Sequence, residues 1–324
     1  MWRRMASQDL GLINVIDRTF VDRDRRRPNT FPCLHHTPTM ISVSDYAGSH
    51  KSSAFECYSF AILGDPDFAL WDDRRIEWRH RQSLGRRTFA YKKLGDKKKA
   101  VLLSEFLNLV GDLCGVCVSF LVDRRLNGLF DGDGESDRTI VAEQWPKAKY
   151  RKATFDRLLR VTHFNSFVLA GLVGPHQNVL WITDQDDIAA NERQLRALTE
   201  IFGSGMCRYL ILPDGTLPFR LGHIRCGTTA SDNGTLQCED IASIPDLVGG
   251  ALSEVFTKYS DTGIRLRKGI DLSPPADVSL KTRSIMGWMT EEHRLKQVVV
   301  CIEPAPSPSL FTVTLVDFIG SPLS

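Results

Sequence analysis

Three aspartates follow apolar stretches that have the composition of buried strands. Asp45 lies near the end of MISVSDY (40–46), Asp123 follows VCVSFLV (116–122), and Asp184 follows VLWIT (179–183). Ligands bind at the carboxyl ends of strands in an open α/β sheet, and neighbouring strands lie only about 4.8 Å apart. Carboxylates there can share Mg²⁺ or Mn²⁺, which prefer oxygen ligands. Such ions activate water and stabilise the leaving oxygen of a phosphodiester, so the pattern predicts metal-dependent phosphodiester chemistry.

A further carboxylate precedes the apolar segment 247–256, which has helical spacing. Pro245 suits the first turn of a helix, so we expect Asp246 at the positive end of that helix. Asp240, beside Glu239, is the second choice for this position. We predict Asp45, Asp184 and Asp246 as the catalytic metal-binding set. The further candidate metal ligands are Asp123, Asp187 and Asp240.

Each of these acids also has an ordinary structural interpretation. An aspartate after a strand is often a turn former or the N-cap of the next helix. Asp187, just before Ile188, fits an N-cap well. Asp246 could serve only to stabilise the helix dipole.

A basic stretch lies between Arg74 and Lys99, and aromatic residues interrupt it at Trp71, Trp78, Phe89 and Tyr91. A local positive field with aromatic rings suits phosphate contact and base stacking. Solvated helix faces with packed aromatics would give the same pattern. The residues that we expect to contact nucleic acid are Arg86, Arg87, Lys92 and Lys93.

The elements that must position these residues alternate between helix and strand. Period-two and continuous apolar runs predict strands at 40–46, 55–63, 87–94, 116–122 and 179–183, with a short strand at 209–212. Helical spacing predicts helices at 71–83, 97–114, 154–173, 188–202, 247–256 and 282–289. The stretch 127–137 is predicted to be loop. A hairpin-led trio of strands followed by alternating helices and strands favours an α/β fold with a mixed sheet flanked by helices. RNase-H-like folds have this order, and so do some other α/β folds.

Domain organisation follows from the changes in composition. Residues 1–38, rich in arginine and proline, are expected to be a poorly ordered basic leader. Residues 39–260 are expected to form the RNase-H-like domain. Residues 261–324 are expected to form a C-terminal extension, with a short helix and a β-hairpin at 298–302 and 310–318.

Composition excludes several classes of protein. The 324 residues carry a formal charge of only +2, and no run approaches the roughly 18 apolar residues that a membrane span requires. We therefore expect a cytosolic protein with no membrane partner. Cys114 and Cys117 form a single C-x-x-C pair, too few for a four-cysteine zinc site. The chain has no phosphate-binding P-loop, dinucleotide-binding or nucleophile-elbow motif.

Short motifs in the chain resemble those of the DUF3800 family, which is regarded as RNase-H-like. LQCEDIASIPDLVGGAL (236–252) resembles the family's C-terminal signature, and Ser231 could supply its serine. ISVSDYAG (41–48) resembles its first strand, with Tyr46 and Ala47 in place of Glu and Ser, and WITDQDD (181–187) its later strand-end aspartate. YKKLGD (91–96) has two lysines and an acid near the third strand, but no glutamate. The resemblance covers roughly residues 40–259.

The sequence leaves two functions open. The first is a nuclease or related phosphodiesterase that depends on Mg²⁺ or Mn²⁺ and acts on DNA or RNA. The second is a non-catalytic RNase-H-like module that binds nucleic acid or a protein partner, which the missing glutamate favours.

Overall fold

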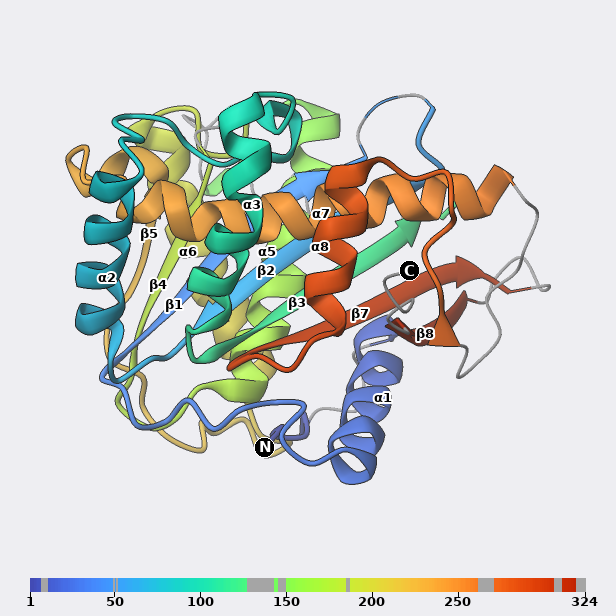
Figure 1. The fold of residues 1–324 in the computed structure, drawn as a ribbon. Helices are drawn as coiled ribbons and strands as arrows, with labels where there is room; N and C mark the ends of the chain where they lie inside the picture. Colours follow the sequence, from blue (N-terminus) through green and yellow to red (C-terminus); the bar gives the residue numbers. More distant parts are fainter. Residues whose placement is uncertain are drawn as a thin grey trace.

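The computed structural model shows an α/β protein with one mixed sheet covered by helices on both faces (Figure 1). The structure describes residues 1–6, 11–48, 50, 52–126, 143–144, 150–184, 187–261, 271–305 and 311–318. The predicted loop 127–137 lies outside these residues. Among the described residues, no helix combines the length and apolar character needed to cross a membrane.

The sheet has the order β5-β4-β1-β2-β3-β7-β8-β6. Its strands are β1 (Thr39–Ala47), β2 (Phe55–Leu63), β3 (Gly115–Asp123), β4 (Asn178–Thr183), β5 (Ile224–Thr228), β6 (Asp271–Leu272), β7 (Leu295–Pro304) and β8 (Phe311–Phe318). β2 is antiparallel to both β1 and β3, whereas β4 is parallel to β1 and to β5, and β7 is parallel to β3. The carboxyl ends of β1, β3, β4, β5 and β7 therefore lie at one edge of the sheet.

Helices cover the sheet in two layers, each over its own apolar core. One face carries α1 (Leu12–Arg26), α5 (Lys152–Leu172) and α6 (Glu192–Leu210). The other carries α2 (Phe68–Arg81), α3 (Lys97–Gly111), α7 (Gln237–Asp261) and α8 (Leu280–Thr290). The short 3-10 helices are η1 (Tyr91–Lys93) and η2 (Thr229–Asp232). Figure 1 shows α7 lying across the face of the sheet, where it contacts β1, β2, β3 and β4.

Most predicted helices and strands are confirmed, including the β1–β2 hairpin, but three assignments are wrong. Residues 87–94 form no strand: Phe89 packs in the core, Tyr91 begins η1, and no strand pairs with them. Tyr209 and Leu210 end α6, and the strand in this region is β5, whose sequence IRCGT is too short and polar to be recognised. α7 begins ten residues before 247, because Pro245 removes only one N–H and the helix continues on both sides of it.

Residues 1–38 are expected from the sequence to be poorly ordered, but those that the structure describes contribute to the core. The apolar residues Leu12, Ile16 and Phe20 form one buried stripe of α1, and Trp2 and Phe31 are buried with them. The C-terminal hairpin is confirmed as β7 and β8, which are antiparallel. Because β7 also pairs with β3 over eight residues, this hairpin extends the main sheet.

Candidate acidic site at the carboxyl edge of the sheet

Asp45 and Asp184 occupy neighbouring positions on β1 and β4. The two strands are parallel, and Ser44 pairs with Thr183, so one residue further along each strand brings Asp45 opposite Asp184. Val43 and Ile182, two residues earlier, both pack in the core beneath α7. Because side chains two residues apart share a face of a strand, both acids lie on the face that α7 covers.

Asp246 approaches the same place from α7. Glycine allows this helix to lie close to the sheet: a Cβ added at Gly249 would come within 3.1 Å of Ser59 Oγ, and Ser59 is the partner of Asp45 on β2. Asp246 stands three residues before Gly249 and is half-buried. Asp246 thus lies in the third turn of α7, not at its first turn as predicted. The packing of α7 against the sheet, and not the helix dipole, brings Asp246 to the carboxyl edge of the sheet.

The pKa of Asp246 is affected by the charge of Asp184, so the two carboxylates lie within electrostatic range of each other. Burial raises the pKa of Asp246, and the negative charge of Asp184 raises it further. Burial also raises the pKa of Asp184, although its side chain reaches solvent at the strand end. Two carboxylates that repel each other in a partly desolvated place favour any cation that can bind between them.

Basic residues face the acid pair from η1. Lys93 lowers the pKa of Asp184, and Lys92 and Lys93 both lower that of Asp246. Both lysines are exposed. The structure therefore brings together Asp184, Asp246, Lys92 and Lys93.

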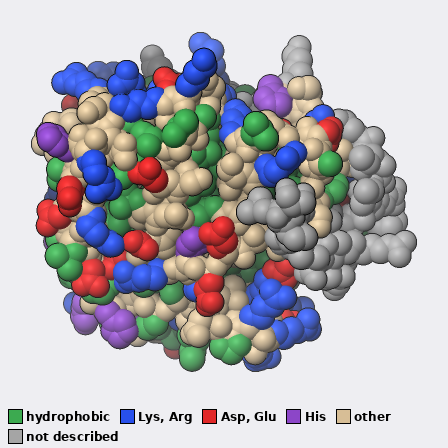
Figure 2. Space-filling model, viewed as in Figure 1, with side chains coloured by type: hydrophobic (Ala, Val, Ile, Leu, Met, Phe, Trp, Pro, Cys, Tyr) green, Lys and Arg blue, Asp and Glu red, His purple; other side chains and the backbone are tan. Residues whose placement is uncertain are grey.

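Arg86 and Arg87 lie exposed in the connection between α2 and η1. Figure 2 shows Lys and Arg side chains gathered along the upper border of the molecule, where Figure 1 places the connection from α2 to α3. Three of the four aromatic residues predicted to stack on bases are not available there. Trp71, Trp78 and Phe89 are 1%, 5% and 2% exposed, because they pack in the core under α2 and α3.

Three of the candidate acids are bound elsewhere. Both oxygens of Asp240 accept hydrogen bonds from guanidinium groups, Arg75 Nη1 and Arg79 Nη1, each at 2.7 Å, in a fully buried ion pair between α7 and α2. Both oxygens of Asp123 accept from the side chain of Arg125. These arrangements correct the prediction of Asp240 and Asp123 as ligands, since their lone pairs already serve arginines.

Asp187 is also held by neighbours, because its two oxygens accept hydrogen bonds from Thr154 Oγ1 and Arg157 Nη1, each at 2.8 Å. Its expected N-cap position is wrong as well. α6 begins at Glu192, and the side chain of Asn191 caps it by accepting from the backbone of Arg193 and Gln194.

Sequence reasoning missed Tyr91 as a partner of Asp246. The backbone N–H of Tyr91 donates to Asp246 Oδ2 at 2.6 Å. The missed signal is the spacing Asp246, Gly250 and Glu254, which puts two acids and a glycine on one face of a helix.

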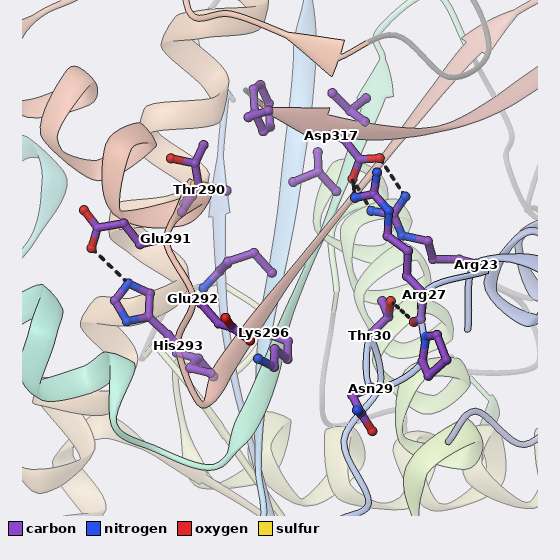
Figure 3. Close-up of a pocket in the computed structure, with 17 residues that line it drawn as sticks. Arg23, Arg27, Asn29, Thr30, Thr290, Glu291, Glu292, His293, Lys296 and Asp317 are labelled. Atoms are coloured by element: carbon purple, nitrogen blue, oxygen red, sulfur yellow. Dashed lines mark hydrogen bonds and ion pairs between the residues drawn. The ribbon is translucent and has the colours of Figure 1, made fainter. Parts of the chain in front are cut away.

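A pocket of about 660 Å³ lies apart from these acids, between the end of α1, the turn from α8 to β7, and the β7–β8 hairpin. Figure 3 shows Arg23 and Arg27 reaching Asp317 on one side and Glu291 facing His293 on the other. No candidate acid contributes to its lining.

Within the residues that the structure describes, no three His, Cys, Asp or Glu side chains are grouped closely enough to hold a metal ion. Neither the protein-family models nor the curated proteins contain a match to this chain. The features of the chain that bear on function are therefore the acid pair, its lysines and the position of Asp45.

Proposed function

We propose that this protein is a divalent-metal-dependent phosphodiesterase that acts on nucleic acid, with Asp45, Asp184 and Asp246 as its acidic ligands. The observation that carries the proposal is that half-buried Asp246 lies within range of the negative charge of Asp184, beside Lys92 and Lys93. A half-buried acid next to a second negative charge destabilises a fold, so its presence favours a role in binding a cation.

The donor set suits Mg²⁺ or Mn²⁺. All three side chains offer carboxylate oxygens, the ligands that these hard cations prefer. The chemistry that such a cation supplies when bound is acidification of water and neutralisation of charge on the phosphodiester. Asp184 and Asp246 would hold the cation, and Lys92 and Lys93 would contact substrate phosphate. Asp45 would supply a third carboxylate from the adjacent strand only after its side chain moved, because the described residues group no three such side chains closely enough for a metal ion.

The order and direction of the strands support the same proposal. An antiparallel trio, β1–β2–β3, is followed by β4 and β5 parallel to β1, with helices between the later strands. We propose that this part of the sheet is RNase-H-like, in agreement with the resemblance of segments 41–48, 181–187 and 236–252 to the DUF3800 family.

We expect the full-length protein with Mn²⁺ to cleave DNA or RNA, tested on single-stranded, double-stranded and hybrid substrates. Asp184→Asn and Asp246→Asn should each lower the cleavage rate by about 100-fold or more, because each removes an anionic ligand. Asp112→Asn is the matched control, since Asp112 is an exposed partner of Arg74.

The same two substitutions provide a test of the electrostatic argument without substrate. Both acids have a raised pKa, so their ionised forms oppose folding at neutral pH. In the absence of metal, Asp184→Asn and Asp246→Asn should therefore unfold at a temperature equal to or above that of the unmodified protein. A protein that binds no Mn²⁺ and leaves every substrate intact would contradict the proposal.

A non-catalytic nucleic-acid-binding module is the second candidate. The lack of a three-residue metal cluster among the described residues favours it, as does the partial neutralisation of both acids by Lys93. This candidate predicts no measurable Mn²⁺ affinity. It also predicts that Asp184→Asn binds nucleic acid at least as tightly as the unmodified protein, because a charge that repels phosphate is gone.

A further inference from the structure

One face of α7 carries Asp246, Gly250 and Glu254, which follow one another at intervals of four residues. Side chains at this spacing lie one above the other along a helix. The face therefore presents an acid at each end and a gap at the glycine. Tyr91 lies along this face and contacts all three positions.

Contacts with α7 hold the backbone N–H, the ring and the hydroxyl of Tyr91. Its backbone N–H donates to Asp246, and its hydroxyl donates to Glu254 Oε2. A Cβ added at Gly250 would lie 2.3 Å from Tyr91 Cγ, closer than real contacts allow. The ring therefore occupies the space that a side chain at position 250 would fill.

Residues before and within α8 support this arrangement from the other side. Lys281 Nζ lies 3.8 Å from the centroid of the Tyr91 ring and donates to the Tyr91 carbonyl at 2.9 Å. Ser279 and Thr282 each donate a hydroxyl hydrogen bond to Glu254 Oε2, at 2.9 Å and 2.7 Å. The C-terminal segment is thus joined to the acidic site through Tyr91.

We propose that Tyr91 is the positioning residue of the acidic site. Its ring, seated on Gly250 and held by Glu254, sets where the backbone N–H meets Asp246 and where Lys92 and Lys93 stand over the acid pair. This inference rests on the proposed function only in taking Asp246 as a cation ligand and the two lysines as phosphate contacts. Because one side chain controls both groups, a change at Gly250 alters cation binding and phosphate binding together.

The test uses Gly250→Ala, Tyr91→Ala and Tyr91→Phe in the full-length protein. Three quantities are measured: Mn²⁺ affinity by calorimetry, affinity for a short DNA duplex without metal, and hydrogen exchange of the amides at positions 91–93. Gly250→Ala and Tyr91→Ala should weaken both affinities and speed exchange at position 91 by about tenfold, the scale of one hydrogen bond to a charged group. Tyr91→Phe keeps the ring on Gly250 and should recover part of each loss.

Gly287→Ala in α8 is the matched control, because an added Cβ there meets nothing within 4 Å. Thermal unfolding of every variant separates local displacement of Tyr91 from loss of the fold. If Gly250→Ala does not fold, the affinities and amide exchange of Tyr91→Phe are compared with those of the unmodified protein instead. Unchanged exchange and unchanged affinities in both Gly250→Ala and Tyr91→Ala would overturn the inference. If the unmodified protein binds neither Mn²⁺ nor DNA, the proposed function fails, and amide exchange still decides the role of Tyr91.

Discussion

At the scale of single residues, the candidate acids of this protein differ in whether a cation already accompanies them. Asp240 has two arginine partners, whereas half-buried Asp246 lies within range of the charge of Asp184, with exposed lysines nearby. The first arrangement is complete and structural. The second leaves the carboxylate of Asp246 repelled by that of Asp184, which is why the proposed cation site is assigned to it.

The structural role of Asp240 makes a direct prediction. Asp240→Asn should lower the free energy of unfolding by ~3–5 kcal/mol, because it leaves the buried guanidinium group of Arg79 without a countercharge and that of Arg75 with Asp72 as its remaining acidic partner. Urea unfolding measures this loss. Asp277→Asn, which removes an exposed partner of Lys258, should change stability little. Equal stabilities of the two variants would show that the buried pair does not join α2 to α7.

At the scale of elements, α1 is tied to the edge of the sheet by charge. Asp317 on β8 forms ion pairs with Arg23, which lies in α1, and with Arg27, the residue that follows α1. Burial alone would raise the pKa of Asp317, but the two guanidinium groups outweigh burial and lower it below the usual 3.8. The folded state therefore holds its proton less tightly than the unfolded chain.

This shift determines how stability depends on pH. An acid with a lowered pKa stabilises the fold above its usual pKa, and the stabilisation is lost as pH falls through the lowered value. Asp317→Asn should therefore destabilise the protein at about pH 6 and lose less stability than the unmodified protein on acidification to about pH 2. Urea unfolding across this range measures both effects. Parallel pH profiles for the two proteins would contradict the assignment.

At the scale of the whole molecule, the N-terminal segment and the sheet share one core. Trp2 is 6% exposed and packs against Phe20, Phe31 and Phe167, with ring centroids 4.9, 4.9 and 5.1 Å away. Gly171 of α5 makes room for it, since an added Cβ would lie 2.3 Å from the indole ring. The described residues of segment 1–38 are therefore part of the folded unit that carries the acidic site.

Trp2→Ala should cost ~3–5 kcal/mol of stability, because it leaves a large cavity in an aromatic cluster. We also expect one cooperative unfolding transition, since the N-terminal segment has no separate core. Val15→Ala, at a 39% exposed position of α1, should stay within about 0.5 kcal/mol of the unmodified protein. Early release of the N-terminal segment in limited proteolysis, before the sheet unfolds, would contradict this view.

Local patterning was sufficient to predict the α/β class, the β1–β2 hairpin, β3, β4 and most helices. Continuous apolar runs and helical spacing are properties of neighbouring residues, so the chain itself displays them. The position of Asp45 and Asp184 at strand ends followed for the same reason. The strand predicted at 87–94 was wrong because alternation of apolar and polar residues cannot by itself provide a partner strand. The prediction of a poorly ordered segment 1–38 was wrong because its many charged residues obscured a buried apolar stripe.

Tertiary structure alone decided which acids meet. Asp240 and Asp246 are six residues apart in one helix, yet the first pairs with the arginines of α2 and the second accepts from Tyr91 within range of the charge of Asp184. Their distinction depends on how α7 is rotated as it crosses the sheet, which the close approach at Gly249 and Gly250 sets. Contacts between residues more than a hundred positions apart, such as Tyr91 with Asp246, leave no periodic trace in a single sequence.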